Sequence, residues 1–151
     1  MNPAALDSFI ARVQAARAVG EIFVAARPFD PHLPATFPEQ LDALTASVSL
    51  QPLGDGWREI DETNARAILH RILDKDLPHG RRLMTTKASD AFIDELWADL
   101  SAPRRHFTNA KFAGRAMQLV SWNPITSAKY DTGVLSASGD SLTLLWAADD
   151  D

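Results

Sequence analysis

The sequence predicts a single α+β domain over residues 1–151, with a helix-rich N-terminal two thirds packed on an antiparallel sheet that ends in a C-terminal β-meander. Three observations support this. Before residue 103, apolar residues recur at helical spacing in several segments. After Pro103 the pattern changes to short runs typical of strands, separated by Gly114, Asn123-Pro124 and Gly139-Asp140. The length fits one domain, and no stretch reads as an interdomain linker.

The first two elements are a helix and a strand. Asn2 followed by Pro3 is typical of a helix start, an N-cap with proline at the first helical position. Gly20 is a plausible stop. Between them, four apolar residues keep helical spacing: Leu6, Phe9, Ile10 and Val13. Residues 21–26 are partly β-branched and lie between Gly20 and Pro28, which predicts a strand.

A loop, a short helix and a hairpin are expected next. Residues 28–38 hold four prolines, which predicts an irregular loop. Thr36 and Glu39 have capping-box spacing and predict a short helix. Residues 48–50 alternate and predict the start of a strand. We expect residues 57–60 to pair back on that strand across a turn at 54–56.

Two longer amphipathic helices follow. Asp61 is a credible N-cap for the first, and Pro78-His79-Gly80 ends that segment. Its apolar face comprises Ala65, Ile68, Leu69, Ile72 and Leu73. Thr86 or Ser89 is expected to cap the second helix. The face of that helix comprises Phe92, Ile93, Leu96, Trp97 and Leu100.

The last forty-five residues are expected to form strands. Residues 106–108 and 116–122 are candidates, with Gly114 between them. Residues 134–138 and 141–146 predict a β-hairpin in which Gly139 begins a type II′ turn. Because a chain of this size holds one core, we expect strand 21–26 to join the same sheet.

Composition limits the function classes. The chain has 15 Lys+Arg against 20 Asp+Glu, a formal charge of −5, which argues against nucleic-acid binding. No apolar run approaches the roughly 20 residues of a membrane helix. Without cysteine there is no disulfide and no thiolate metal site. The first residues lack the features of a secretory signal, so a cytoplasmic location is expected.

The charge is unevenly distributed along the chain. Residues 76–115 carry 5 acidic and 7 basic side chains, whereas residues 116–151 carry 5 acidic residues and one lysine. The chain ends in three aspartates, which are either a solubilising frayed tail or part of a docking surface for a basic partner.

Motifs for catalysis, metals and cofactors are weak, and we predict none of these. The four histidines (His32, His70, His79 and His106) lack metal-ligand spacing, and we expect them to be surface or capping residues. Gly-x-Ser-x-Gly and phosphate-loop motifs are absent. Asp131-Thr132-Gly133 resembles the catalytic turn of retroviral-type aspartic proteases, but the flanking residues and the 18 residues that follow do not fit such an enzyme.

The segment 122–134, the following hairpin, Leu145-Trp146 and the acidic end together resemble the C-terminal part of small bacterial proteins. Some of these are similar to immunity proteins, which protect a cell from its own antibacterial toxins. The resemblance covers about 30 of 151 residues. It implies a cytosolic inhibitor that neutralises a toxin by direct binding, without catalytic residues.

A protein partner, for example a basic toxin domain, would be captured faster by an acidic surface. We therefore predict aspartates as electrostatic contacts and aromatic residues as anchors: Trp122, Tyr130, Asp131, Asp149, Asp150 and Asp151.

Two alternatives remain open. The chain could be a small-ligand-binding protein or enzyme with a pocket between helices and sheet, for which the first residues to examine are His70, His79, Arg81 and Arg82. It could also self-associate through pairing of its last strand with the same strand of a second copy.

Overall fold

The computed structural model describes residues 1–33 and 35–150 and confirms the α+β class. The helices are α1 (Pro3–Ala16), α2 (Phe37–Ala46), α3 (Glu62–Asp74) and α4 (Thr86–Trp97), with one 3-10 turn, η1 (Gly54–Gly56). The strands are β1 (Glu21–Pro28), β2 (Arg58–Ile60), β3 (Arg105–Thr108), β4 (Ala110–Ala113), β5 (Gln118–Trp122), β6 (Tyr130–Ala137) and β7 (Ser141–Asp149).

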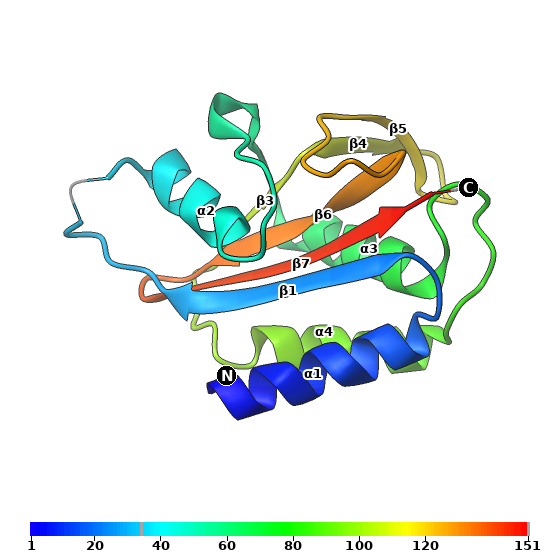
Figure 1. The fold of residues 1–151 in the computed structure, drawn as a ribbon, viewed down its shortest axis with the longest axis horizontal. Helices are drawn as coiled ribbons and strands as arrows, with labels where there is room; N and C mark the ends of the chain where they lie inside the picture. Colours follow the sequence, from blue (N-terminus) through cyan, green and yellow to red (C-terminus); the bar gives the residue numbers. More distant parts are fainter. Residues whose placement is uncertain (34, 151) are drawn as a thin grey trace.

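Five strands form one antiparallel sheet in the order β1-β7-β6-β3-β2 (Figure 1). The expectation that strand 21–26 joins the C-terminal strands is confirmed, since β1 pairs with β7 along its whole length. Because β7 lies between β1 and β6, both of its edges are already hydrogen-bonded. Self-association through the last strand, one of the open alternatives, is therefore wrong.

Helices cover both faces of the sheet. Helices α1, α3 and α4 pack on one face, and α2 packs on the other (Figure 1). Successive side chains of β7 alternate between the two cores: Leu145 and Ala147 face α1, α3 and α4, while Leu144 and Trp146 face α2. This double cover explains why β7 is apolar at every position from Leu144 to Ala148 instead of alternating with polar residues.

Local capping signals set the helix starts. Asn2 Oδ1 accepts from the Ala5 N–H at 2.8 Å, and Asp61 Oδ1 accepts from the Asn64 N–H at 2.8 Å, as predicted. Helix α2 begins after Thr36, which caps it as predicted. For α4 the predicted cap was wrong, because Thr85 and not Thr86 or Ser89 accepts the N–H of Ala88.

The predicted hairpin over residues 48–60 does not form. The N–H groups of Val48, Ser49 and Leu50 donate to carbonyls at the end of α2, and Ser49 has a positive φ of 65°. Residues 48–50 are thus a turn that closes the helix, not a strand. With no strand there to pair with, β2 pairs with β3 instead.

Strands β4 and β5 form a separate two-stranded sheet, which we call the arm (Figure 1). The predicted strand 116–122 begins at Gln118, because Ala116 and Met117 belong to the turn of the arm. Strand β4 was not predicted. The β6–β7 hairpin is confirmed, but its predicted type II′ turn is wrong, because Gly139 lacks the positive φ that this turn requires.

Candidate functional site

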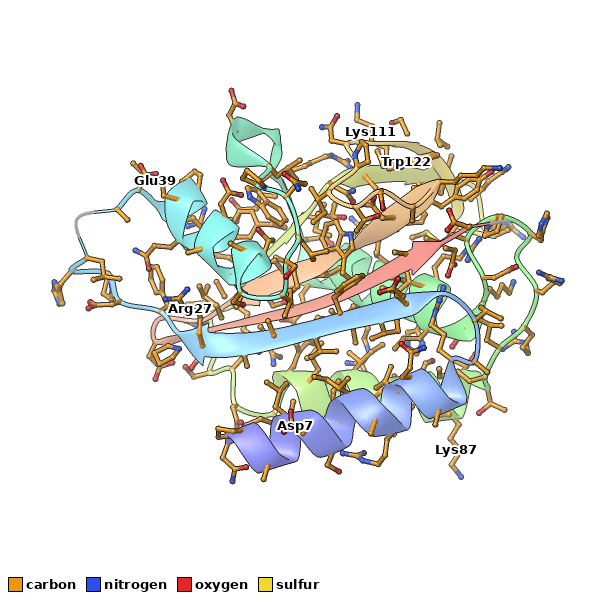
Figure 2. All side chains as sticks on the ribbon, viewed as in Figure 1. Asp7, Arg27, Glu39, Lys87, Lys111 and Trp122 are labelled. Carbon is orange, nitrogen blue, oxygen red and sulfur yellow. The ribbon has the colours of Figure 1, made fainter. Side chains whose placement is uncertain are left out.

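The two predicted aromatic anchors lie together. Trp122 ends β5 and Tyr130 begins β6, and their rings stack with centroids 5.5 Å apart and planes at 29°. Both side chains are half-buried. Figure 2 shows Trp122 and Lys111 on the arm, away from α1. The arm and the start of β6 therefore present an aromatic pair at the surface.

Asp131 does not have the predicted role of an electrostatic contact, because its side chain is fully buried. Its carboxylate accepts hydrogen bonds from the N–H groups of Ile125 and Thr126 at 3.0 and 3.1 Å, and from Trp146 Nε1 at 3.1 Å. These donors compensate the loss of hydration. Asp131 thus fixes the loop between β5 and β6 and cannot meet a partner.

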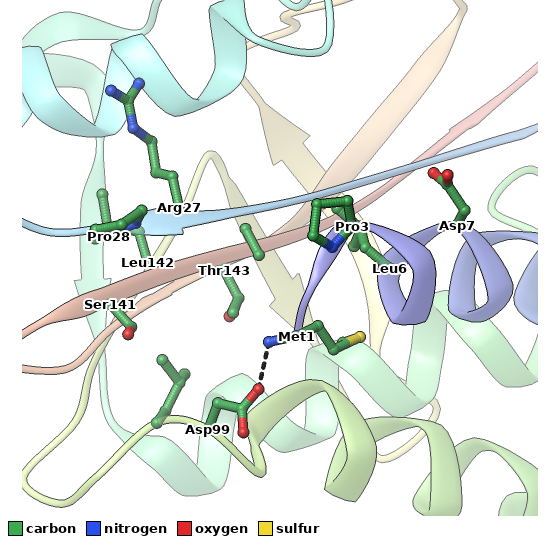
Figure 3. A pocket seen from close by; sticks show the side chains of 12 residues that line it. Met1, Pro3, Leu6, Asp7, Arg27, Pro28, Asp99, Ser141, Leu142 and Thr143 are labelled. Atoms are coloured by element: carbon green, nitrogen blue, oxygen red, sulfur yellow. Dashed lines mark hydrogen bonds and ion pairs between the residues drawn. The ribbon is translucent and has the colours of Figure 1, made fainter.

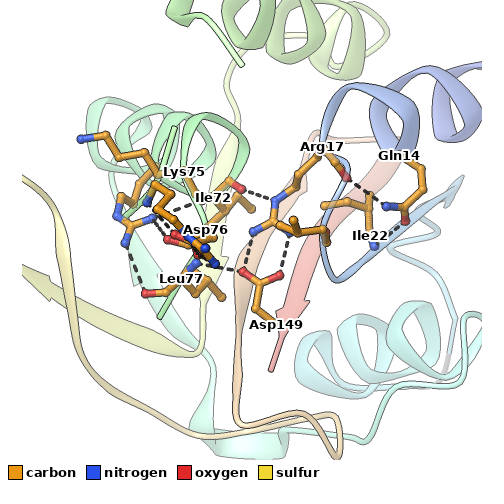
Figure 4. Close-up of polar contacts among 11 residues, drawn as sticks. Gln14, Arg17, Ile22, Ile72, Lys75, Asp76, Leu77 and Asp149 are labelled. Carbon is orange, nitrogen blue, oxygen red and sulfur yellow. Dashed lines mark hydrogen bonds and ion pairs between the residues drawn. The ribbon is translucent and has the colours of Figure 1, made fainter. Parts of the chain in front are cut away.

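Asp149 is also buried, and its predicted role at the surface is likewise wrong. It ends β7 and forms a bidentate ion pair with Arg17, at 2.8 and 2.7 Å, while also accepting the N–H of Leu77 at 2.8 Å (Figure 4). Arg17 donates in addition to the carbonyl of Ile72 at 2.5 Å. The chain up to Asp149 is therefore part of the sheet and not a frayed tail.

Only one of the three terminal aspartates is exposed among the residues that the structure describes. Asp150 is exposed, and its Oδ1 accepts the N–H of Lys129 at 2.9 Å. Asp151 lies outside the described residues. Of the predicted contact residues, Trp122, Tyr130 and Asp150 thus remain as surface groups on neighbouring parts of the fold.

The sequence did not single out Arg17, although its position carries a signal. Arg17 comes four residues after Val13 and so continues the buried stripe of α1. An arginine on such a stripe is rarely buried unless it has a partner. Its partner, Asp149, is 132 residues away and could not be identified from local pattern.

The arm contains a β-bulge that the sequence did not reveal. Lys111 pairs with Ser121 and Phe112 with Leu119, so Val120 has no partner on β4. A bulge redirects the side chains around it. Val120 is 60% exposed, the most exposed large apolar side chain in the described part of the chain.

Two serine–histidine–carboxylate trios occur in the structure. His70 Nδ1 lies 2.7 Å from Ser89 Oγ, and its Nε2 lies 3.1 Å from Asp90 Oδ1. The hydroxyl of Ser89 is buried and also donates to the carbonyl of Thr86. A substrate has no access to this oxygen, so the trio joins α3 to α4 and does not provide a nucleophile.

The second trio lies deeper. His106 Nδ1 is 2.7 Å from Ser136 Oγ, and its Nε2 is 3.0 Å from Glu62 Oε1. His106 is 1% exposed and packs on Trp97, so the expectation that it is a surface or capping residue is wrong. Burial lowers the pKa of His106, against the opposing effect of Glu62. The ring is a neutral part of the core.

The residues named for a ligand pocket fall into two groups. His79 lines a cleft of about 420 Å³ between the end of α3 and β5, and His70 and Arg82 line an adjoining hollow of about 260 Å³. Arg81 points elsewhere: it pairs with Asp76 at 3.1 Å and lines a separate hollow of about 310 Å³. The pocket predicted between helices and sheet thus has a counterpart near Tyr130, without Arg81.

Another hollow, of about 410 Å³, lies between the start of α1, the end of α4 and the strands β1 and β7 (Figure 3). Its walls are mostly apolar, with Leu6, Pro28 and Leu142 among them. The carboxylate of Asp99 in this hollow is paired with the amino group of Met1. Its polar lining also includes Asp7, Ser141 and Thr143, but Arg27 is its single basic side chain, whereas basic side chains gather around the cleft near Tyr130.

Residues 1–33 and 35–150 were compared with the requirements of a metal site and of a membrane-spanning helix. No group of three or more His, Asp or Glu side chains there is arranged to hold a metal ion. None of the helices described has both the length and the apolar surface needed to cross a bilayer.

Comparison with known proteins gives no further guide to function. The chain matches no model of a protein family, and no curated protein or solved structure is significantly similar to it.

Proposed function

We propose that this chain is a protein-binding inhibitor that neutralises a cognate bacterial toxin by direct contact, in the manner of an immunity protein. The observation that carries the proposal is the exposure of Val120 at the bulge of the arm, two residues before the Trp122–Tyr130 stack. Aromatic and apolar side chains held at the surface by a rigid scaffold are typical anchors of protein interfaces.

The proposed contact surface comprises Val120, Trp122, Tyr130 and Asp150. The residues are linked locally: Trp122 stacks on Tyr130, and Asp150 accepts the N–H of the residue before Tyr130. Asp131 and Asp149 are left out because they are buried. The exposed carboxylates of Asp150 and Glu21 line one hollow, and together with the net charge of −5 they favour a basic partner.

The proposal can be tested with the full chain as bait at low salt. A lysate of cells that produce the chain is passed over wild-type protein and over the Val120→Asp variant, and retained proteins are identified by mass spectrometry. The retained protein is then expressed in a host with and without this chain. We expect the partner to stop growth alone, and wild-type chain but not Val120→Asp to restore growth.

The matched control is Leu33→Asp, which places the same charge at another exposed apolar residue, 47% exposed and in the loop between β1 and α2. It should capture the partner and restore growth like wild type. A partner whose capture or toxicity is unaffected by Val120→Asp would contradict the proposed surface. A captured partner that harms no host, or harms it equally with the chain present, would contradict the inhibitor function.

A further inference from the structure

The cleft near Tyr130 has cationic and polar walls. It is about 420 Å³ in volume and lies between the end of α3, the loop after it and strand β5 of the arm. Its polar lining comes from Arg71, Lys75, His79, Gln118 and Tyr130, and no residue of the lining is acidic. The adjoining hollow of about 260 Å³ shares Arg71 and Lys75 and adds Arg82 and Arg115, with Asp74 as its one acidic residue.

Four cations gather in this region, and within the described part of the chain no salt bridge joins any of them to a carboxylate. Within the described residues, salt bridges of arginine side chains involve Arg12, Arg17, Arg66, Arg81, Arg104 and Arg105. None of them involves Arg71, Lys75, Arg82 or Arg115. Positive charge therefore accumulates around the cleft, although the whole chain is acidic.

Arg71 gives the strongest indication of a ligand. The residue is only 8% exposed, and buried arginine is normally paired with a carboxylate. Here the guanidinium donates instead to the carbonyls of Met117, Asp76, Lys75 and Leu77, at 3.0, 2.9, 3.3 and 3.4 Å. One of its five N–H groups is left without an acceptor within the described residues.

The two carboxylates that act electrostatically on Arg71, Asp76 and Asp149, do not fill this gap. Asp76 is bonded to the side chain of Arg81, and Asp149 is bonded to Arg17 (Figure 4). Burial lowers the pKa of Arg71, with Arg17 adding to that effect and Asp76 and Asp149 opposing it. An anion in the cleft would supply the missing negative charge.

The remaining walls indicate what the anion is attached to. The apolar part of the lining comes from Leu77, Pro78, Leu119 and the ring of Tyr130. Trp122 stacks on Tyr130 and holds its ring. The cleft volume falls within the range of about 300–1,000 Å³ usual for small-molecule sites. Guanidinium and ammonium groups are well suited to phosphate.

We infer that this cleft binds a small phosphorylated molecule of mononucleotide size. Arg71 and Lys75 line the cleft and face its phosphate, and Arg115 adds positive charge from the adjoining hollow. Tyr130 and Leu119 contact its organic part. The inference goes beyond the toxin-binding proposal and does not depend on it. Because Tyr130 belongs to both surfaces, the two sites are distinguished by Val120, which lines neither the cleft nor the hollow.

The test is calorimetric titration of the full chain at low ionic strength with AMP, adenosine and inorganic phosphate. AMP should bind in a saturable manner with one site per chain, at least about tenfold more tightly than adenosine or phosphate. Lys75→Gln and Arg115→Gln, whose side chains form no ion pair in the described residues, should each weaken AMP binding about fivefold to tenfold, the effect of losing one charge-assisted contact.

The controls are Arg27→Gln and Lys87→Gln, which remove exposed cations away from the cleft, and Val120→Asp. All three should bind AMP within about twofold of wild type. The inference is overturned if AMP gives no saturable binding at millimolar concentration, or if the control cations weaken binding as much as Lys75→Gln. Phosphate binding as tightly as AMP would overturn the assignment of an organic part.

Discussion

The guanidinium of Arg17 and the carboxylate of Asp149 form a bidentate ion pair, at 2.8 and 2.7 Å, between two side chains that are 0% and 3% exposed. The pair joins the end of α1 to the last residue of β7. Through the Arg17–Ile72 and Asp149–Leu77 hydrogen bonds it also holds the end of α3 and the loop beside the cleft. The acidic end of the chain is therefore first of all a structural element.

Replacing Arg17 by methionine should strongly destabilise the fold, because Asp149 would stay buried without a counter-charge. We expect the free energy of unfolding to fall by about 3–5 kcal/mol, measured by urea denaturation. The matched control is Arg12→Met, which breaks the exposed pair of Arg12 with Glu95 and should lower the free energy of unfolding far less. Equal effects of the two substitutions would contradict the structural role of the buried pair.

Replacing Gly133 by alanine should also be severe. A Cβ there would lie 2.1 Å from the carbonyl oxygen of Leu145 and 2.7 Å from Cα of Trp146, both in the neighbouring strand backbone. Because β7 is fixed on both sides, we expect a loss of about 3 kcal/mol or more in thermal or urea unfolding. At Gly139 nothing lies within 4 Å of the added Cβ, so Gly139→Ala should change stability little. A well-tolerated Gly133→Ala would show that the strands can separate locally.

Asp131 should control the order of the loop between β5 and β6. Asp131→Ala removes the acceptor of the Ile125 and Thr126 N–H groups, and we expect a loss of about 3 kcal/mol in unfolding free energy. Hydrogen exchange of these two amides, followed by NMR, should accelerate more than that of amides in α1. The control is the same substitution at an exposed aspartate, Asp7→Ala. Unchanged protection at Ile125 and Thr126 would contradict this account.

The stability of the fold should decrease as pH falls below about 6.5, because of His106. Burial lowers its folded pKa below the ordinary value of 6.5, so the unfolded chain takes up a proton that the folded chain refuses. The contribution of neutral His106 to the free energy of unfolding is fully present above pH 6.5. It is lost as pH falls toward the lower pKa of the folded state, and the free energy of unfolding then changes by at most about 1.4 kcal/mol per pH unit.

Urea unfolding between pH 7.5 and 5.5 tests this sign. His106→Gln should flatten the pH dependence whatever its effect on stability at pH 7.5, and His32→Gln, which changes an exposed ring, should leave the slope unaltered. The carboxylates with lowered pKa, such as Glu62 beside His106 and Arg104, lose their contribution only below about pH 4.5 and do not interfere. A slope that survives His106→Gln would assign the effect to another group.

Much of the fold follows from short-range signals. The starts of α1, α2 and α3 were predicted because an N-cap and the N–H group that it binds are separated by only three residues. The β6–β7 hairpin was predicted for the same reason, since the alternating strands and the turn between them are adjacent in sequence. The alternating pattern of residues 48–50 was misleading, because their N–H groups close the end of α2.

The candidate sites depend on information that no local pattern contains. The sequence by itself determined the α+β class, the caps of α1, α2 and α3, and the acidity of the chain end. Only the tertiary structure decided that Asp131 and Asp149 are buried, that Val120 stands on a bulge, and that Arg71 faces a cleft without a carboxylate partner. The reason is physical: burial and charge pairing are set by which distant segments cover a side chain. Arg17 reaches Asp149 because β1 pairs with β7 and α1 packs on the sheet.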